Sequence, residues 1–377
     1  MTFRVAQQIS DIPASDWDRL VGSDNPFVSH GYLEAMESSG CAGAHNGWQP
    51  HHALLYEGDT LVAAAPGYLK THSYGEFVFD FGWAQAAQRA GLPYYPKWLI
   101  AVPFTPVTGP RLLAEGPTQR QALLEAMTSH AEKERLPGLH VLFGNAQDHA
   151  ALQAADLLPR EDCQYLWQNQ GFSDFDVYLN SLSRSDRKNI RRERRRVAEA
   201  GIDITAVPAS KIGKEDWPVI FQCYCNTYHE RGQEPYWNAG LLQSLAARFP
   251  DQLLLFLARR EGHIIAMAIT LRSGERLYGR HWGCLEQVDC LHFETCFYQP
   301  IEYCIRHGLS VFDAGAQGEH KLKRGFLPET TRSYHWLQNP QLREAVAHYL
   351  TRERAAVGQY IEWADVRARR GQGTAGS

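Results

Sequence analysis

The order of structural signals along this chain of 377 residues occurs twice, and this repeat constrains the fold more than any single motif. The segments ALLYEGDTLVAAAPGYLK, from Ala53, and LARREGHIIAMAITLRS, from Leu257, each read as two strands joined by a tight Glu-Gly turn. In each half a further strand and a helix follow, and Gly-Leu then opens a buried strand, at Gly138 and at Gly308. Two similar sequence features, the hairpin and the Gly-Leu strand start, recur in the same order and predict a tandem duplication.

The length of the chain also favours more than one domain, because a single core rarely grows so large. Alternating strands and helices predict two mixed α+β domains, each a mixed β-sheet flanked by helices. We place the first domain at residues 1–170 and the second at residues 171–338. Residues 339–377 are expected to form a charged helix and a disordered tail. The predicted helix from residue 291 to residue 308 should kink or restart at Pro300.

The composition excludes several classes of protein. The net charge is −4, so binding to nucleic acid or to an acidic membrane would have to be local. The N-terminus shows neither the basic nor the apolar region of a signal peptide, and the apolar runs are too short to span a bilayer. The eight cysteines show no CxxC spacing and are expected to be free thiols in the cytoplasm.

One segment between the two halves is strongly basic. Residues 184–196 hold eight basic and two acidic side chains without a proline, and we predict a basic helix over residues 182–200. The commoner interpretation is a solvated helix face. The second interpretation is an electrostatic binding site for a phosphate-rich ligand, either a nucleotide cofactor or RNA, because arginine forms paired hydrogen bonds with phosphate oxygens.

Chemically versatile side chains gather between residues 276 and 331. A strand containing Arg280, His281 and Trp282 leads to a helix whose first turns hold His292 and Glu294. The later loop GAQGEHKLKRG gathers further polar groups. For acyl transfer to an amine, Glu319, His320 or Glu286 could act as base, and Lys323 or Arg324 could stabilise the oxyanion. We therefore predict catalytic residues Glu319, His320 and Lys323, and donor-binding residues Arg280, His281, Trp282, His292, Glu294, Gln317 and Arg324.

Two alternatives accompany this interpretation. The loop could be an ordinary polar loop whose charges face water. The histidines could also suggest a metal, but their spacing matches no standard ligand set, so no metal is predicted. In the first half, the blocks HSYGEFVFDFGWA and YYPKWLIAVPFTPVTGPRLL could line an acceptor pocket or could form a packed, irregular insertion. The predicted acceptor-binding residues are Tyr74, Glu76, Asp80, Trp83, Tyr95 and Lys97.

The run LHFETCFYQPIEYCIRHGLSVFDAGAQGEHKLKRGFLPETTRSYHW closely resembles the FemAB-like predicted N-acyltransferases of bacteria. The blocks from Asn25, Tyr68 and Tyr94 resemble earlier parts of the same family, so the resemblance covers roughly residues 20 to 365. It implies two GNAT-like domains in tandem, that is, domains of the acyl-CoA N-acyltransferase type.

The resemblance also implies a reaction, the transfer of an acyl or aminoacyl group to an amine. FemAB relatives use aminoacyl-tRNA as donor and a peptidoglycan precursor as acceptor, whereas ordinary GNAT enzymes use acyl-CoA. These relatives often carry a Phe-Lys pair after the final strand. Here the pair reads Leu322-Lys323, so the resemblance carries over the lysine and not the aromatic residue.

The sequence therefore predicts a cytoplasmic N-acyltransferase that holds no tightly bound cofactor. Its donor would be a thioester such as acyl-CoA or an aminoacyl-tRNA, and its acceptor an amine on a cell-wall or peptide-like metabolite. The tRNA would contact residues 184–196. The alternative is a non-catalytic protein with a GNAT-like scaffold that recognises an amino-sugar, a peptide or RNA.

Overall fold

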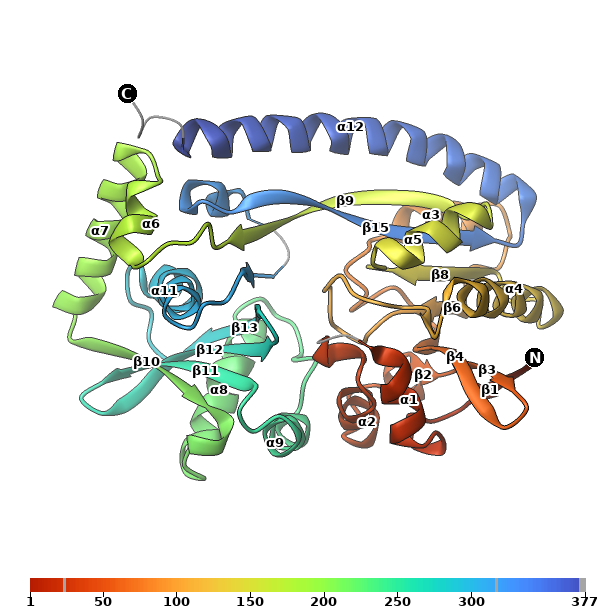
Figure 1. Cartoon of the computed structure of the whole chain (residues 1–377), viewed down its shortest axis with the longest axis horizontal. Helices are drawn as coiled ribbons and strands as arrows, with labels where there is room; N and C mark the ends of the chain where they lie inside the picture. Colours follow the sequence, from red (N-terminus) through yellow and green to blue (C-terminus); the bar gives the residue numbers. More distant parts are fainter. Residues whose placement is uncertain (23–24, 316–317, 373–377) are drawn as a thin grey trace. The chain divides into compact units, whose positions relative to one another are not determined.

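The computed structural model describes residues 1–22, 25–315 and 318–372, and it divides the chain into two compact units (Figure 1). Unit 1 contains residues 1–162 and 330–358, and unit 2 contains residues 163–329 and the chain from 359 onward. The chain passes between the units within β9 (Leu158–Gln168), β15 (Leu327–Leu337) and α12 (Pro340–Gln372). The three contiguous segments expected from the sequence therefore do not coincide with the compact units.

Unit 1 has two groups of paired strands. The first follows the order β1-β3-β4-β7 and the second the order β2-β5-β6-β8-β15. The strands are β1 (Thr2–Ala6), β2 (Trp48–Pro50), β3 (His52–Glu57), β4 (Thr60–Ala65), β5 (Gly67–Lys70), β6 (Lys97–Ile100), β7 (Leu113–Ala114) and β8 (Gly138–Leu142). The helices are α1 (Ala14–Val21), α2 (His30–Ser38), α3 (Phe81–Arg89), α4 (Pro117–Lys133) and α5 (Ala146–Ala154).

The apolar stripe of α4 fills the core of unit 1. Leu123, Leu124 and Met127 are fully buried and pack against side chains of β3, β6 and β8. Three apolar residues at helical spacing on one face are the pattern of a helix that covers a sheet, which explains why the sequence indicated this helix correctly.

Unit 2 is built on the strand order β10-β11-β12-β13-β14-β9. The strands within it are β10 (Ile202–Pro208), β11 (Leu253–Arg260), β12 (His263–Ser273), β13 (Arg276–Cys284) and β14 (Val311–Asp313). Its helices are α6 (Phe175–Asn180), α7 (Arg184–Glu199), α8 (Asp216–His229), α9 (Ala239–Arg248), α10 (Leu291–Phe293) and α11 (Gln299–Arg306). A π-helical segment, Glu294–Tyr298, joins α10 to α11, and the 3-10 helix η6 (Glu319–Arg324) follows β14.

The π-helical segment ends just before the proline that the sequence marked. Pro300 is the second residue of α11, and it lacks the N–H that a continuous α-helix would need there. A wider π turn is a known way to accommodate such a break. The helix expected over residues 291–308 is therefore three consecutive helical segments, and its change of type lies beside Pro300 as predicted.

Both units contain the repeated order that the sequence predicts. The hairpins β3–β4 and β11–β12 are antiparallel, and the second turns through Glu261 and Gly262, both at positive φ. After each hairpin, two strands pair in parallel across an intervening helix: β6 with β8, and β13 with β14. Each parallel pairing covers three residues. The mixed α+β, tandem GNAT-like fold predicted from the sequence is confirmed.

Helix α8 lies very close to β13, and a glycine permits this. A Cβ at Gly283 would lie 1.8 Å from the carbonyl oxygen of Cys223 in α8, so no larger residue fits the present backbone. The side chains of Thr227 and Asn226 donate hydrogen bonds to the carbonyls of Trp282 and Cys284. In this way α8 satisfies backbone groups near the end of β13.

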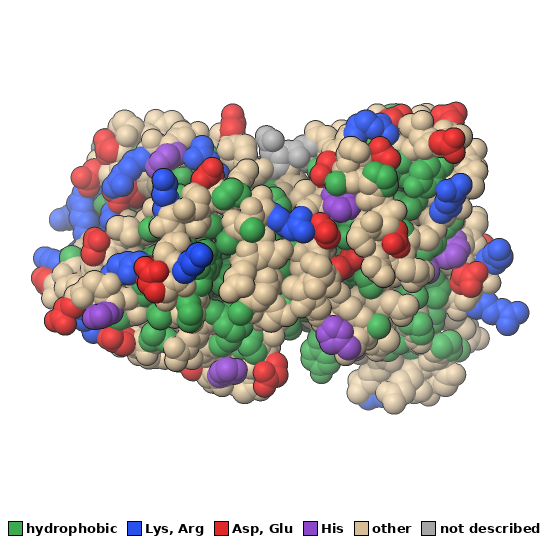
Figure 2. All heavy atoms as spheres, turned by 90° about the horizontal axis from the view of Figure 1, so that it is seen from below, with side chains coloured by type: hydrophobic (Ala, Val, Ile, Leu, Met, Phe, Trp, Pro, Cys, Tyr) green, Lys and Arg blue, Asp and Glu red, His purple; other side chains and the backbone are tan. Residues whose placement is uncertain are grey.

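Charged side chains of both signs are mixed on the surface. On the face shown in Figure 2, acidic and basic side chains lie interspersed, in keeping with a net charge of −4. Among the described residues no helix is both long and apolar enough to cross a bilayer.

Candidate functional site

The 3-10 helix η6 presents three different faces because side chains three residues apart eclipse one another in such a helix. Lys321 and Arg324 form one face, and both are buried. His320 and Lys323 form another face, where His320 is half-buried and Lys323 is exposed. The three-residue spacing thus puts His320 and Lys323 on the same side of η6, the imidazole partly covered and the ammonium exposed.

His320 belongs to a group of rings that we call the imidazole–aromatic cluster: Trp282, His292, Phe293, Phe297 and His320. The ring of His320 lies 5.7 Å from Phe293 and 5.4 Å from Phe297, measured between centroids. His292 lies 5.6 Å from the same Phe297. Trp282 of β13 packs edge-on against His292 at 5.3 Å. The fold therefore brings together three predicted site residues from β13, α10 and η6.

Both histidines of the cluster favour the neutral form. Burial, aided by His320 and Arg324, lowers the pKa of His292 to about 4. Burial, together with Arg324 and Lys321, also lowers the pKa of His320 below its ordinary value. Within the described part of the chain, His320 Nε2 is buried and has no hydrogen-bond partner. A neutral imidazole with an unengaged ring nitrogen can accept a proton, as a general base must.

Gly318 allows the ring of His320 to take this position. The φ of Gly318 is +116°, and a Cβ there would lie 2.4 Å from Cε1 of His320. Only glycine adopts this backbone conformation readily, and only glycine leaves room for the imidazole. The glycine-rich sequence before η6 thus has a specific steric function.

Lys321 is a buried lysine that sequence reasoning did not assign to the site. It is 2% exposed and its ammonium donates a hydrogen bond of 2.5 Å to the carbonyl of Gly315. Burial lowers the pKa of Lys321 to about 8, although the carboxylate of Asp313 opposes the shift. The sequence signal that could have found it is the i, i+3 spacing of Lys321 and Arg324 in a 3-10 turn.

The predicted donor residue Arg324 lies inside unit 2. Its guanidinium donates to Glu193 of α7 at 2.9 Å, to the hydroxyl of Tyr298 at 2.8 Å and to the carbonyl of His320 at 2.9 Å. The guanidinium also lies 3.9 Å from the ring centroid of Phe293. Since these contacts engage the whole guanidinium, Arg324 holds η6 against α7.

The remaining predicted donor residues face in other directions. His281 packs against Tyr224 and Trp237, at 4.9 and 4.2 Å, and burial lowers its pKa well below the ordinary value. Glu294 pairs with Arg194 at 3.1 Å and accepts from Gln299. Arg280, the neighbour of His281 in β13, is half-buried. Gln317 lies outside the described residues.

The three predicted catalytic residues do not form one hydrogen-bonded group. Glu319 is exposed and accepts a hydrogen bond of 3.3 Å from the hydroxyl of Tyr360. No hydrogen bond or ion pair joins Glu319, His320 and Lys323 to one another among the described residues. Only His320 and Lys323 share a face of η6, because Glu319 lies one residue before that face.

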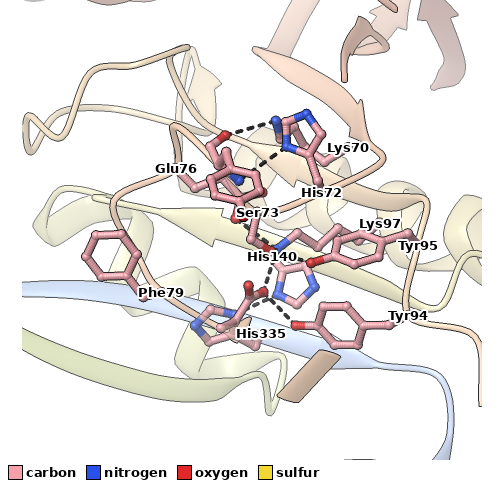
Figure 3. A network of polar contacts seen from close by, with 12 residues as sticks. Lys70, His72, Ser73, Glu76, Phe79, Tyr94, Tyr95, Lys97, His140 and His335 are labelled. Atoms are coloured by element: carbon pink, nitrogen blue, oxygen red, sulfur yellow. Dashed lines mark hydrogen bonds and ion pairs between the residues drawn. The ribbon is translucent and has the colours of Figure 1, made fainter. Parts of the chain in front are cut away.

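Unit 1 contains a separate buried polar network, which we call the lysine network (Figure 3). Lys97 is fully buried and its ammonium donates to Glu76 at 2.8 Å, to Ser73 at 2.9 Å and also to Asp80. Tyr94 donates to the same Asp80 at 2.6 Å, and Tyr95 bonds Ser73 at 2.7 Å. Lys70 donates to the carbonyl of Tyr74.

The charges of the lysine network neutralise one another. Burial opposes ionisation of Asp80, but Lys97 and His140 hold the pKa of its carboxyl well below the ordinary value. Burial raises the pKa of Glu76 to about 7 and lowers the pKa of Lys70 to about 7. Nearby, His140 and His335 lie 2.7 Å apart through their Nδ1 atoms, and burial lowers the pKa of His140 to about 3.

The predicted acceptor residues are thus brought together, but mostly in the interior. Glu76, Asp80 and Lys97 are at most 4% exposed and satisfy one another. Trp83 packs against His335 with 4.8 Å between ring centroids. Tyr74 is the exception, because its side chain is 65% exposed. The network fixes the irregular segment of residues 71–80, as expected for a packed insertion.

No group of three or more histidine, cysteine or carboxylate side chains suited to a metal ion occurs in the described residues. The eight cysteines are all free.

The comparison with family models covers nearly the whole chain. Residues 8–369 match the FemAB-like family, which is described as acting in peptidoglycan biosynthesis or recognition. The chain belongs to the FemAB-like family. No curated protein matches this chain.

Solved structures agree on the fold of this FemAB-like protein. The crystal structure of FemX is similar with a TM-score of 0.56 and 12% identity, covering 92% of this chain and all of that one. The C-terminal domain of a putative lysylphosphatidylglycerol synthetase from Agrobacterium fabrum has a TM-score of 0.54 and 10% identity, covering 90% and 95%. L-PGS from Bacillus licheniformis has a TM-score of 0.51 and 11% identity, covering 87% and 98%.

Proposed function

We propose that this protein is an N-acyltransferase whose reaction takes place on the open face of η6. The observation that carries the proposal is that His320, whose lowered pKa favours the neutral form and whose buried Nε2 has no hydrogen-bond partner among the described residues, shares one side of a 3-10 helix with the exposed Lys323. The FemAB-like family and the fold of FemX support a transferase that acts on peptidoglycan-related compounds.

The chemistry follows from the two side chains. The acceptor amine attacks the carbonyl carbon of the donor, and Nε2 of His320 takes the proton that the attacking nitrogen loses. The ammonium of Lys323 stabilises the oxyanion of the tetrahedral intermediate. When the carbon–sulfur bond of a thioester or the carbon–oxygen bond of an aminoacyl ester breaks, the leaving group takes the proton from His320. The products are an amide and a free thiol or hydroxyl.

The other predicted residues have supporting functions in this proposal. Phe293 and Phe297 pack against the imidazole of His320 and exclude water from it. Trp282 and His292 support them, because Trp282 packs on His292 and His292 packs on Phe297. The exposed carboxylate of Glu319 is tied to Tyr360 and helps to orient η6. Acceptor binding by Tyr74, which is 65% exposed in unit 1, stays a separate prediction. The acceptor would be an amine on a cell-wall or peptide-like compound.

The test is a product assay with a matched lysine control. The purified protein is incubated with acyl-CoA or aminoacyl-tRNA and with muropeptide amines, and amide products are detected by mass spectrometry. Lys323→Ala should lower the transfer rate at least about 100-fold, the usual effect of losing one oxyanion donor, with little change in melting temperature. Lys214→Ala, at an exposed lysine elsewhere in unit 2, should leave the rate unchanged.

The assay also distinguishes catalysis from simple binding. A protein that binds a donor only when folded must gain thermal stability from it, by about 2.7 kcal/mol at 100 times Kd. Thermal shifts without any amide product, over the full panel of donors and amines, would favour the non-catalytic scaffold. Full activity of Lys323→Ala would overturn the assignment of Lys323.

A further inference from the structure

The outward side of α7 is a continuous row of cations. A pocket of about 560 Å³ is lined by five residues of this helix: Arg184, Arg187, Lys188, Arg191 and Arg195. With 100° between successive residues, these five side chains fall within about 100° of the helix circumference. We call this side the cationic face of α7. Five of the basic residues in this segment therefore lie on one side of the helix.

Most of the charge on this face is not neutralised by the protein. Arg191 pairs with Asp176 at 3.1 Å, but both side chains are more than half exposed, so this contact is weak. Arg187 donates to the carbonyl of Asn180. Arg184, Lys188 and Arg195 are exposed and have no polar partner among the described residues.

The opposite side of α7 connects to η6. Glu193 accepts hydrogen bonds from the hydroxyl of Tyr298 and from Arg324, which in turn donates to the carbonyl of His320. Arg194, which lies between the two sides of the helix, pairs with Glu294 at 3.1 Å and with Glu302 of α11 at 2.7 Å and so fixes α7 to the helix before β14. A change in the position of α7 would thus be transmitted to the segment that carries His320.

The length of the cationic face indicates the size of its ligand. The eleven-residue step from Arg184 to Arg195 spans roughly 16 Å at 1.5 Å per residue. Arginine binds phosphate oxygens through paired N–H groups, and a row of five cations, only one of which pairs with a carboxylate, suits a chain of phosphates better than a single one.

We propose that the cationic face of α7 binds a row of phosphate groups, and that Glu193 and Arg324 couple this binding to the His320 segment. In the transfer reaction the phosphates belong to the nucleotide part of the donor, either a phosphodiester chain or the phosphates of a coenzyme. The assignment of these phosphates to the acyl donor rests on the proposed reaction. Phosphate binding by α7 and its coupling to the His320 segment are measured without catalysis.

The first experiment measures binding by fluorescence anisotropy with a labelled twelve-nucleotide single-stranded RNA, with unlabelled CoA as competitor. The triple variant Arg184→Gln, Lys188→Gln, Arg195→Gln should weaken RNA binding at least tenfold. Its slope of log K against log salt should decrease by about 2, because each phosphate contact to a single strand contributes about 0.7. If micromolar CoA displaces the RNA, the site binds coenzyme phosphates. If RNA binds and CoA does not displace it, the site binds a phosphodiester chain.

A matched control removes the same charge elsewhere. The variant Lys133→Gln, Lys211→Gln, Lys214→Gln neutralises three exposed lysines outside α7 and should bind RNA within twofold of the wild type. Equal weakening in both triple variants would overturn the site, because net charge alone would then explain binding. Absence of binding of both RNA and CoA to the wild type at low salt would also overturn it.

The second experiment tests the coupling by hydrogen exchange. RNA should slow exchange of the amides in residues 319–326 of the wild-type protein. Glu193→Gln should bind RNA with nearly unchanged affinity but show no such slowing, because the charged link to Arg324 is lost. Slowing of equal size in Glu193→Gln would overturn the coupling. A failed acyl-transfer assay with intact RNA binding would refute the proposed function and leave the phosphate site standing.

Discussion

Lys321 shows at the scale of one residue that the η6 segment is not optimised for stability. Its pKa of about 8, against an ordinary value of 10.5, means that the folded protein holds a buried ammonium at a cost. One pKa unit corresponds to about 1.4 kcal/mol, so the cost near neutral pH is about 3 kcal/mol. The cost disappears as pH rises from 8 to 10.5, because the folded form then releases its proton while the unfolded chain keeps it.

We therefore predict that Lys321→Met stabilises the protein at pH 7. The substitution removes the buried charge and gives up one hydrogen bond to Gly315, worth about 1 kcal/mol, so the free energy of unfolding should increase by about 2 kcal/mol. Denaturant unfolding measures this change directly. Acyl transfer should decrease in the same variant, because Lys321 anchors η6. A less stable Lys321→Met protein would show that the ammonium is a net stabilising group.

At the scale of elements, local signals predicted most of the fold. The Glu-Gly turns predicted both hairpins, and the spacing of the apolar residues Leu123, Leu124 and Met127 predicted helix α4. The basic helix was expected over residues 182–200 and lies at Arg184–Glu199. These features depend on residues close together in sequence, where turn geometry and periodicity act directly.

Contacts between distant elements could not be predicted in the same way. The approach of α8 to β13 at Gly283 depends on two segments sixty residues apart in sequence, and nothing local to GRHWGC marks that glycine as a packing site. Likewise, the pairing of Glu193 with Arg324 links α7 to η6 across 131 positions. Charge pattern alone could not show which acid of α7 faces inward.

The contact between α8 and β13 gives a prediction at this scale. Gly283→Ala should destabilise the protein by about 3 kcal/mol, at the upper end for overpacking, because the new methyl group meets backbone atoms of Cys223 and Tyr224. The control is Gly82→Ala in α3, where a Cβ would meet no atom within 4 Å. Gly262 is not used as a control, because its positive φ would strain an alanine whatever the space. Thermal unfolding that is equal for Gly283→Ala and Gly82→Ala would contradict the close packing.

At the scale of the whole molecule, buried histidines make stability depend on pH. Burial lowers the pKa of His51 and of His292 to about 4 and that of His140 to about 3. The unfolded chain binds protons at these positions near pH 6.5, while the folded chain does not, so stability is lost as pH falls through this range. Burial also raises the pKa of four carboxyl groups, which act in the opposite direction, but the histidines whose pKa is lowered are more numerous. The four carboxyl groups are those of Glu76, Asp148, Glu294 and Asp313.

The melting temperature should therefore decrease between pH 7 and pH 5. The expected loss is about 1–2 kcal/mol for each fully buried histidine, or several degrees in total. Differential scanning calorimetry over this range checks it, and His292→Gln should reduce the slope by the share of one histidine. A melting temperature that is constant or higher at pH 5 would contradict these protonation states.

The candidate site could be predicted only in part, for reasons that belong to this same scale. Sequence identified the residues of η6 and the helix from Leu291, and the fold does bring His292, Trp282 and His320 together. The sequence could not show that Glu319 accepts a hydrogen bond from Tyr360. Nor could it show that Glu76, Asp80 and Lys97 neutralise one another in the interior. Side-chain burial depends on the complete fold, and charged residues look alike in sequence whether buried or exposed.

The central claim, that His320 and Lys323 act together on one face of η6, is tested most directly by a double-mutant cycle on the single-turnover rate of amide formation. His320→Gln and Lys323→Ala should each lower the rate at least about 100-fold, and the double variant should be much less impaired than the product of the two effects, because both groups serve one step. Two folded single variants that both transfer at the wild-type rate would contradict the claim.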